Sequence, residues 1–329
     1  MKLTILGAGS FGTAMANHAA SLGHDVCLWS RDAAQVEAIN RTHTNPDYLK
    51  EYKLCETLKA EDDFAKAVRF APKIILAVPA QSLRDVMQRL SSLDFFKGRI
   101  LSLAKGIEIS TGKLSSEIAE EVLPHISYSV LSGPSHAEEV IRDLPTAVVA
   151  ASRSHETAVE WQKDLNSPHF RIYTGDDLIG VELGGAVKNV IAIAVGIGRG
   201  LNFGDNAIAA LATRGLAEIM RLGAARGAAP LTLAGLAGVG DLMVTCYSSH
   251  SRNLNFGLAI GKGMTAEEAS SQIGQVVEGA HTVKALVAYA REAKVELPIA
   301  EGVYAVLYEG ASVKQILEKL LFRDPKPER

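Results

Sequence analysis

The sequence predicts an α/β amino-terminal half, built as a doubly wound sheet of Rossmann type, followed by an all-helical carboxyl-terminal half. The 329 residues open with a strand, a glycine turn and a helix. Short apolar strands then alternate with helices up to about residue 175, a pattern typical of a parallel sheet. After that point the strand signals stop, and helical periodicity rich in alanine and glycine takes over. We therefore expect two domains, residues 1–177 and residues 178–329.

The first domain contains the segment that most clearly predicts a ligand-binding site. Residues 2–6 predict a buried strand, and the turn that follows reads Gly7-Ala8-Gly9-Ser10-Phe11-Gly12 before an alanine-rich helix at 13–22. In such a turn Gly7 makes the tight bend, Gly9 lets a pyrophosphate approach the backbone, and Gly12 allows close helix packing. The phosphate would lie at the positive end of the helix. Since a second strand at 25–29 completes a βαβ spacing, we expect the turn to bind a dinucleotide.

The end of the second strand bears on which dinucleotide binds. An acid there would bind the ribose 2'-hydroxyl of NAD, but the chain has Ser30 and Arg31, and the nearest acid is Asp32. Arginine suits a 2'-phosphate, so we predict that NADPH is used at least as well as NADH. The alternative is that Arg31 is a solvated residue opening the next helix.

Further strands are predicted at 74–78, 100–103, 128–131, 147–150 and 170–174, with a helix at 81–90. Lys105 directly follows one strand and the small-residue loop 132–137 follows the next. Doubly wound sheets bind ligands beyond such carboxyl ends. Both features also have an ordinary explanation, as an exposed lysine and as plain turn chemistry.

Lys188 is a cation in the middle of an apolar helix. At helical spacing it shares one face with Val181, Gly185, Ala192 and Val195. We expect Gly184 and Gly185, in the preceding turn, to leave room over Lys188 that a small ligand could fill. Alternatively, the lysine reaches water or pairs with an acid such as Glu182. The helices expected in this half are 178–198, 207–227, 231–240, 252–262, 266–274, 279–293, 298–309 and 312–320.

A second candidate site lies between two of these helices. Asp241 stands in a glycine-rich apolar stretch, where it is either a functional acid or a helix cap. Ser249 or Ser251 could cap the helix that starts near residue 252, and its positive end together with Arg252 would suit a phosphate. We interpret His250 as a solvated loop residue.

Composition limits the class of protein. A hydrophobic fraction of 47%, a charged fraction of 22% and a net charge of -3 give no reason to expect nucleic acid or an anionic membrane surface as partner. Cys27, Cys55 and Cys246 form no metal-type or redox-type pair, which fits a reducing cytoplasm. The amino terminus has too short an apolar run for a signal peptide, and we expect no membrane span and no metal. We expect small-molecule partners, and the small-residue helices favour a homodimer. The tail at 323–329 looks frayed.

In combination, segments 7–14, 104–108, 133–135, 182–189, 206–216 and 235–253 resemble the NAD(P)-dependent glycerol-3-phosphate dehydrogenases of bacterial type. The resemblance runs over nearly the whole chain. It implies reversible reduction of dihydroxyacetone phosphate to sn-glycerol 3-phosphate with NADP(H) or NAD(H), supplying glycerophospholipid synthesis. The first domain would then bind the dinucleotide, and the second would be the substrate and catalytic domain.

The resemblance also implies roles for individual residues. Lys188 would be the general acid/base at the carbon-2 oxygen, with Lys105 and Asp241 in the same pocket. Gly133 and Ser135 would contact the substrate, while Ser251, Arg252 and Asn253 would hold its phosphate. The cofactor-binding residues implied are Gly7, Gly9, Ser10, Phe11, Gly12, Arg31, Tyr48, Lys105, Ala137, Arg252, Val276 and Glu278.

One segment departs from the family pattern. In the family pattern a proline follows the Tyr-Leu pair, whereas in this chain Lys50 follows Tyr48 and Leu49.

Two other functions remain open at this point. A β-hydroxyacid or 6-phosphogluconate-type dehydrogenase shares the two-domain plan and a helical lysine, but the adjacent Lys188 and Asn189 and the triplet 251–253 argue against it. A non-catalytic NADPH sensor would not need Lys105, Lys188 and Asp241 together.

Overall fold

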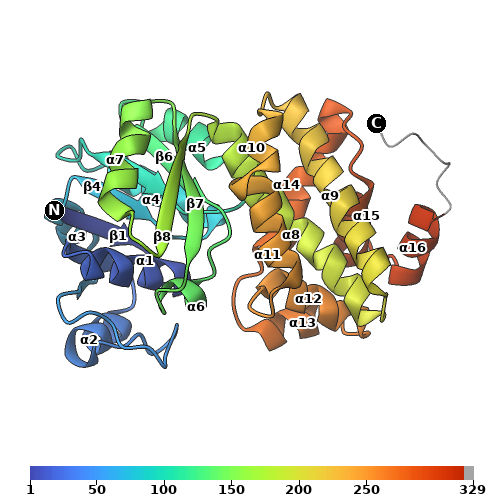
Figure 1. The fold of residues 1–329 in the computed structure, drawn as a ribbon, viewed down its shortest axis with the longest axis horizontal. Coiled ribbons are helices and arrows are strands. Elements are labelled where there is room, and N and C mark those ends of the chain that lie inside the picture. The colour runs from blue at the N-terminus through green and yellow to red at the C-terminus, as the bar shows by residue number, and fades with distance from the viewer. Residues whose placement is uncertain (322–329) are drawn as a thin grey trace.

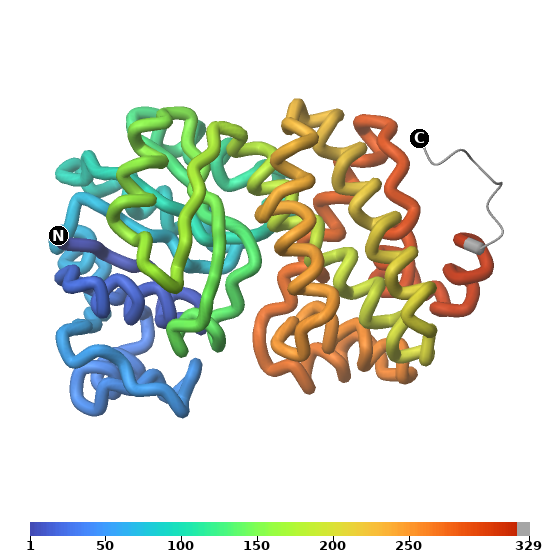
Figure 2. The backbone as a smooth tube through the Cα atoms, in the orientation of Figure 1, coloured from blue at the N-terminus to red at the C-terminus, as the bar shows by residue number. Residues whose placement is uncertain are grey.

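The computed structural model describes residues 1–321 and has an α/β half beside a helical half (Figure 1). The amino-terminal strand and the last described helix lie at opposite ends of the molecule (Figure 2). The predicted tail at 323–329 is outside the described residues.

Within residues 1–321, eight strands form one sheet in the order β3-β2-β1-β4-β5-β6-β7-β8. Neighbouring strands are parallel except for the antiparallel pair β6 and β7. All seven strands expected from the sequence are present within two residues of the expected bounds. The short β3 was missed, because its three residues carry no apolar run. The strands are β1 (Lys2–Leu6), β2 (Asp25–Trp29), β3 (Lys59–Glu61), β4 (Lys73–Leu76), β5 (Arg99–Ser102), β6 (Ser127–Ser132), β7 (Thr146–Ser152) and β8 (Phe170–Gly175).

Helices cover both faces of the sheet, which explains why its central strands read as continuous apolar runs. One face packs against α1 (Ser10–Ser21), α6 (Ala137–Val140) and α7 (His155–Leu165), and the other against α3 (Phe64–Phe70), α4 (Leu83–Ser91) and α5 (Ser115–Val122). Helix α2 (Ala33–Thr42) follows β2, and the 3-10 turn η1 (Ala80–Ser82) precedes α4. Helices α3, α5, α6 and α7 were not predicted.

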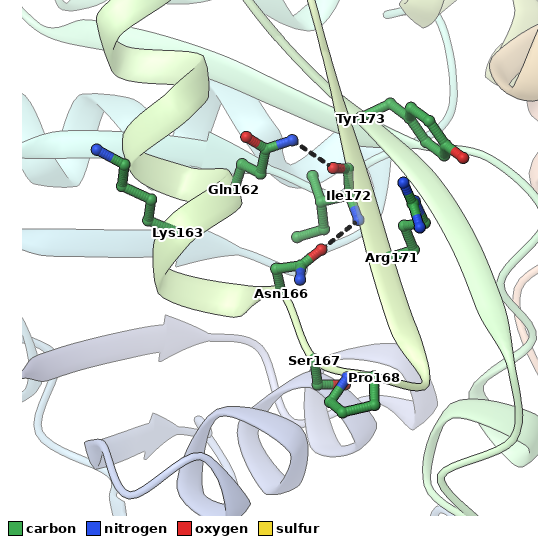
Figure 3. A pocket seen from close by; sticks show the side chains of 8 residues that line it. All are labelled: Gln162, Lys163, Asn166, Ser167, Pro168, Arg171, Ile172 and Tyr173. Carbon is green, nitrogen blue, oxygen red and sulfur yellow. Dashed lines mark hydrogen bonds between the residues drawn. The ribbon is translucent and has the colours of Figure 1, made fainter.

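The free edge of β8 is capped by the connection from α7. Gln162 Nε2 donates to the Ile172 carbonyl at 2.6 Å, and the Ile172 N–H donates to Asn166 Oδ1 at 3.0 Å (Figure 3). The Phe170 N–H donates to Ser167 Oγ at 2.9 Å. Side chains thus occupy backbone groups that would otherwise be open to another strand.

Helix α8 (Leu178–Gly200) is the centre of the other half, and it begins directly after β8. By length and mean hydropathy, 1.7 in its most apolar window, α8 could cross a membrane, but 89% of that window is buried inside the protein. Helices pack around it, so α8 has the all-round apolar surface of a core helix. They are α9 (Asp205–Ala225), α10 (Pro230–Ala234), α11 (Asp241–Tyr247), α12 (Arg252–Gly261), α14 (Glu278–Ala293) and α15 (Pro298–Tyr308). Helix α13 (Ala266–Ile273) packs against α12, and α16 (Val313–Leu321) packs against α15.

The prediction of one continuous helix at 231–240 was wrong. The chain forms α10, then an extended Gly235, then the π-helical turn η2 (Leu236–Gly240), and only then α11. A Cβ on Gly238 would lie 1.8 Å from the Leu233 carbonyl oxygen, so the break depends on glycine packing backbone against backbone. As a result, Asp241 is the first residue of a helix rather than part of a loop.

Candidate active site

The site is built where the carboxyl end of the sheet meets α8 and α11. Lys105 follows β5 and Gly133 follows β6, while Lys188 lies in the middle of α8 and Asp241 begins α11. Lys188 is 6% exposed and Asp241 is 1% exposed. Four segments far apart in the sequence therefore bring their polar groups together in an apolar setting.

One carboxylate joins two ammonium groups. Lys105 Nζ donates to Asp241 Oδ2 at 2.7 Å and to the Gly133 carbonyl at 3.0 Å. Lys188 Nζ donates to Asp241 Oδ1, and to Thr245 Oγ1 at 2.8 Å. Two ammoniums facing one carboxylate leave the cluster with a net positive charge.

The structure corrects three alternatives that the sequence left open. The acid that pairs with Lys188 is Asp241, not Glu182, because Glu182 accepts hydrogen bonds from Ser115 and Ser116 at the start of α5. The N-cap position of α11 is Gly240, and the Asp241 carboxylate binds Lys105 and Lys188 instead, so Asp241 is not a helix-cap acid. Lys105 is not a surface lysine, since 17% of its side chain is exposed.

Burial sets the proton affinities of the pair. Burial lowers the pKa of Lys188 most, the Asp241 carboxylate raises it, and the Lys105 ammonium lowers it, so that together they bring the pKa down to about 7. Burial also raises the pKa of Asp241, but the Lys105 and Lys188 ammoniums outweigh burial, so the net shift is downward. Asp241 thus stays ionised, while Lys188 can give up a proton near neutral pH.

The two glycines before Lys188 do different things from what we expected. A Cβ on Gly184 would lie 2.4 Å from the Ala237 carbonyl oxygen, so this glycine lets α8 pack against η2. A Cβ on Gly185 would lie 2.7 Å from Ser132 Oγ and 3.4 Å from Lys105 Cγ. Gly185 therefore makes room for the Lys105 side chain, and the expectation that both glycines leave room for a ligand is wrong.

The predicted phosphate triplet lies at the start of α12. Ser251 caps the helix, its Oγ accepting from the Leu254 N–H at 3.2 Å, whereas Ser249 does not take that position. Arg252 is exposed and its Nη1 donates to the Val276 carbonyl at 2.9 Å. The Asn253 amide is buried, donating to Asn189 Oδ1 at 3.0 Å and accepting from the Gly279 N–H at 2.9 Å.

The glycine turn has the geometry expected of a dinucleotide cradle. Gly7 has a φ of +119°, and a Cβ on Gly12 would lie 1.9 Å from the Gly7 carbonyl oxygen. A Cβ on Gly9 would meet no described atom within 4 Å. The first turn of α1, with Ser10 and Phe11, carries no side-chain cap bond in the described structure, so its N–H groups are available to an anion.

The other predicted cofactor residues are spread over both halves. Arg31 is exposed beyond β2, Tyr48 is half-buried in the connection after α2, and Ala137 begins α6. Val276 is exposed, whereas Glu278 is half-buried and its Oε1 accepts from the Ala80 N–H at 3.3 Å. Within residues 1–321, Glu278 Oε2 has no hydrogen-bond partner. Within residues 1–321, hydrogen bonds thus join the lysine cluster to Gly133 and Glu278 to the sheet end, but none joins Arg31 or Tyr48 to the lysines.

Sequence reasoning missed three polar residues of the cluster. Thr245 contacts Lys188, Ser132 Oγ donates to Asp241 Oδ2 at 3.4 Å, and Asn189 Nδ2 donates to the Lys105 carbonyl at 3.5 Å. Thr245 follows Asp241 by one helical turn, so the pair could have been found from the spacing. Ser132 and Asn189 are brought in by packing of distant segments.

The described residues offer no metal-binding centre beside the lysine cluster. Among the residues that the structure describes, no group of three or more His, Cys, Asp or Glu side chains could hold a metal ion. A hollow between α7 and β8, lined among others by Lys163 and Arg171, contains none of the predicted site residues (Figure 3).

A Rossmann-type sheet with a dinucleotide cradle, facing a buried lysine pair on a helical half, defines the class of NAD(P)-dependent dehydrogenases. Family models for the amino-terminal and carboxyl-terminal parts of NAD-dependent glycerol-3-phosphate dehydrogenase match residues 2–158 and 177–318. The chain belongs to the NAD-dependent glycerol-3-phosphate dehydrogenase family.

Individual relatives agree over the full length. The chain is 46% identical to the glycerol-3-phosphate dehydrogenase (NAD(P)+) of Staphylococcus aureus over 330 residues, covering 99% of each. The crystal structure of glycerol-3-phosphate dehydrogenase from Coxiella burnetii is 40% identical with a TM-score of 0.95, covering 98% of this chain and 99% of that one. The Plasmodium falciparum enzyme is 26% identical with a TM-score of 0.88, covering 100% and 97%. These matches decide against a β-hydroxyacid or 6-phosphogluconate-type dehydrogenase.

Proposed function

We propose that this protein catalyses the reversible NAD(P)H-dependent reduction of dihydroxyacetone phosphate to sn-glycerol 3-phosphate. The observation that carries the proposal is the buried cluster of Lys188, Asp241 and Lys105 at the carboxyl end of a dinucleotide-type sheet, in a chain of this family. The product would supply glycerophospholipid synthesis.

In this mechanism Lys188 is the general acid. A nicotinamide held at the glycine turn would supply a hydride for carbon-2, and negative charge would develop on the carbon-2 oxygen. Lys188 donates its proton to that oxygen, and the Lys105 ammonium stabilises the charge. Asp241 holds both ammonium groups in place through its two carboxylate oxygens. In the reverse direction, neutral Lys188 removes the proton from the alcohol.

The substrate's other groups would be held by neighbouring loops. Gly133 and Ser135 would contact the substrate, and the phosphate would bind Arg252 at the positive end of α12, beside Ser251. Asn253 already has two internal partners, so its contribution would be to orient Asn189 next to the lysines.

The cofactor would lie across the glycine turn. Gly9, Ser10 and Phe11 offer backbone N–H groups for the pyrophosphate, and Gly7 and Gly12 keep the turn tight. Arg31 would face a 2'-phosphate. Tyr48, Lys105, Ala137, Arg252, Val276 and Glu278 would complete the cofactor contacts.

The direct test removes the proposed acid. Lys188→Ala should lower the turnover of dihydroxyacetone phosphate with NADPH at least about 100-fold, the size typical of general acid/base catalysis, while NADPH still binds. Lys262→Ala, an exposed lysine at the end of α12, is the control and should keep full activity. A Lys188→Ala enzyme that retains most of its turnover would overturn the assignment.

A second variant tests the choice of cofactor. Arg31→Ala should weaken NADPH affinity and leave NADH affinity unchanged, because only NADPH carries the phosphate that the guanidinium would bind. The control is Arg41→Ala, another exposed arginine in the same half that pairs with Glu37. Unchanged NADPH affinity in Arg31→Ala would mean that Arg31 is a solvated surface residue.

We also propose a cytoplasmic homodimer. Three free cysteines suit a reducing compartment, and α9 exposes small apolar residues such as Ala207 and Ala210 together with Met220. Sedimentation at micromolar concentration would reveal the oligomeric state.

A further inference from the structure

Asn45 is a buried polar side chain outside the proposed catalytic cluster. It lies in the connection after α2, three residues before Tyr48, and is 0% exposed. Its Nδ2 donates to the Ala8 carbonyl at 2.9 Å and to Thr13 Oγ1 at 2.8 Å. Its Oδ1 accepts from Gln35 Nε2 at 2.9 Å. A buried amide that is hydrogen-bonded at both its nitrogen and its oxygen fixes the positions of the groups that it contacts.

The group it holds is the carbonyl of the glycine turn. The Ala8 oxygen accepts from Asn45, from Gln35 Nε2 at 3.2 Å and from Thr13 Oγ1 at 3.2 Å. A trans peptide is planar, so its N–H points away from its C=O. With the Ala8 oxygen held inward, the Gly9 N–H must face outward, on the open side where a pyrophosphate would lie.

The same side chain also shapes the Tyr48 segment. Asn45 Oδ1 accepts from the Asp47 and Tyr48 N–H groups, each at 3.2 Å, which forms an Asx turn. Leu49, which follows, has a left-handed φ of 58° and is buried. Its carbonyl accepts from the Tyr52 N–H at 3.0 Å. The Asn45 hydrogen bonds and the burial of Leu49 therefore keep this segment folded, although the exposed Lys50 stands where the family pattern has a proline.

We propose that Asn45 is a positioning residue for dinucleotide binding, whose amide aims the Ala8–Gly9 peptide at the pyrophosphate and ties the Tyr48 segment to the glycine turn. The inference rests on the proposed function only in that a dinucleotide binds at this turn. Asn45 acts on the backbone of the glycine turn, at the pyrophosphate that NADPH and NADH share. The inference therefore applies equally to both cofactors.

Asn45→Asp separates the two tasks of the side chain. The carboxylate can still accept from the Asp47 and Tyr48 N–H groups, but it cannot donate to the Ala8 oxygen or to Thr13. We expect dissociation constants for NADPH and NADH, measured by fluorescence titration without substrate, to rise at least about tenfold, a loss of about 1.4 kcal/mol of binding free energy. In turnover, the KM for cofactor should rise while kcat at saturating cofactor stays near the wild-type value.

A matched control excludes a general effect on folding. Asn40 also uses both ends of its amide, donating to and accepting from the Ala60 backbone at 2.9 Å, but next to β3 and away from the turn. Asn40→Asp should leave both cofactor affinities unchanged even if it lowers the thermal midpoint. Should Asn45→Asp fail to fold, Gln35→Ala removes another donor to the Ala8 oxygen and should raise both dissociation constants by a smaller factor.

Wild-type affinity in a folded Asn45→Asp protein, or in Gln35→Ala where Asn45→Asp does not fold, would overturn the inference. Equal weakening in Asn40→Asp would do the same. Failure of the proposed function is a separate result: the wild-type protein would then bind cofactor without turning over dihydroxyacetone phosphate.

Discussion

Lys188 owes its chemistry to its surroundings rather than to its residue type. An exposed lysine is fully protonated at neutral pH, whereas burial beside Lys105 brings the pKa of Lys188 down to about 7. Asp241 prevents a larger fall by sharing its two oxygens between the ammoniums. At neutral pH Lys188 therefore holds a proton that it can transfer, and the Asp241 carboxylate still orients the lysine.

This environment predicts a pH dependence with opposite signs in the two directions. Reduction needs protonated Lys188, so kcat/KM for dihydroxyacetone phosphate should be level below about pH 7 and fall above it. Oxidation needs the neutral amine, so its rate should rise over the same interval. Pre-steady-state or isotope-sensitive rates measured from pH 5.5 to about pH 9 would check both limbs.

Asp241→Asn should move this profile. Removing the carboxylate removes the influence that raises the pKa of Lys188, so the limb for reduction should shift to lower pH. Asp205→Asn, an exposed acid at the start of α9, should leave the profile unchanged. A profile that stays in place in Asp241→Asn would show that another group titrates.

Among the helices, α8 and α12 pack with their backbones in near contact. A Cβ on Gly196 would lie 2.2 Å from the Leu254 carbonyl oxygen, and one on Gly257 would lie 2.1 Å from the Ile193 carbonyl oxygen. The glycines are therefore reciprocal, each helix providing one against the other's backbone. This contact fixes α8, and so Lys188, relative to the start of α12.

Gly257→Ala should cost stability for this reason. The added methyl meets backbone that cannot move aside, so we expect a loss of about 1–3 kcal/mol in the free energy of unfolding, measured with urea. Gly175→Ala, at the end of β8, is the control, because a Cβ there meets only side-chain atoms at 3.4 Å or more; its change should be within about 0.5 kcal/mol. Equal stabilities of the two variants would contradict the packing argument.

The α/β half and the helical half are joined by several polar contacts that are buried or partly buried. Asp241 of α11 binds Lys105 after β5, Glu182 of α8 binds Ser116 of α5, and Glu278 of α14 accepts from Ala80 after β4. Breaking the halves apart would leave these groups without partners at a cost in free energy. The two halves should therefore unfold together.

Cofactor binding tests this coupling. Trp29 and Trp161, the two tryptophans of the chain, report on the α/β half, whereas far-UV circular dichroism is dominated by the helical half. Both signals should give one transition, and NADPH at a hundredfold excess over its Kd should stabilise both by about 2.7 kcal/mol. Two separate transitions, with only the tryptophan signal shifted, would show that the halves unfold independently.

Local patterns were enough for much of the fold. The glycine turn, seven strands and the long helices of the second half each have a short-range signature of apolar period and turn residues. Helices α3, α5, α6 and α7 were missed because each is short and mixes apolar with charged residues, so its helical period is weak in the sequence, and packing on the sheet compensates for this weak signal. Likewise the helix expected at 231–240 is broken by a backbone contact between Gly238 and Leu233 that no local pattern reveals.

For the site, the sequence indicated which residues are functional candidates, but not which of them contact one another. Lys188, Lys105 and Asp241 could each be chosen from local context, as an odd cation, a residue after a strand and an acid among glycines. Which acid faces Lys188, what Gly184 and Gly185 make room for, and how Asn45 holds the glycine turn depend on segments up to 136 residues apart. Such contacts exist only once the chain is packed, because burial and distance, which set hydrogen bonds and pKa values, are properties of the folded molecule.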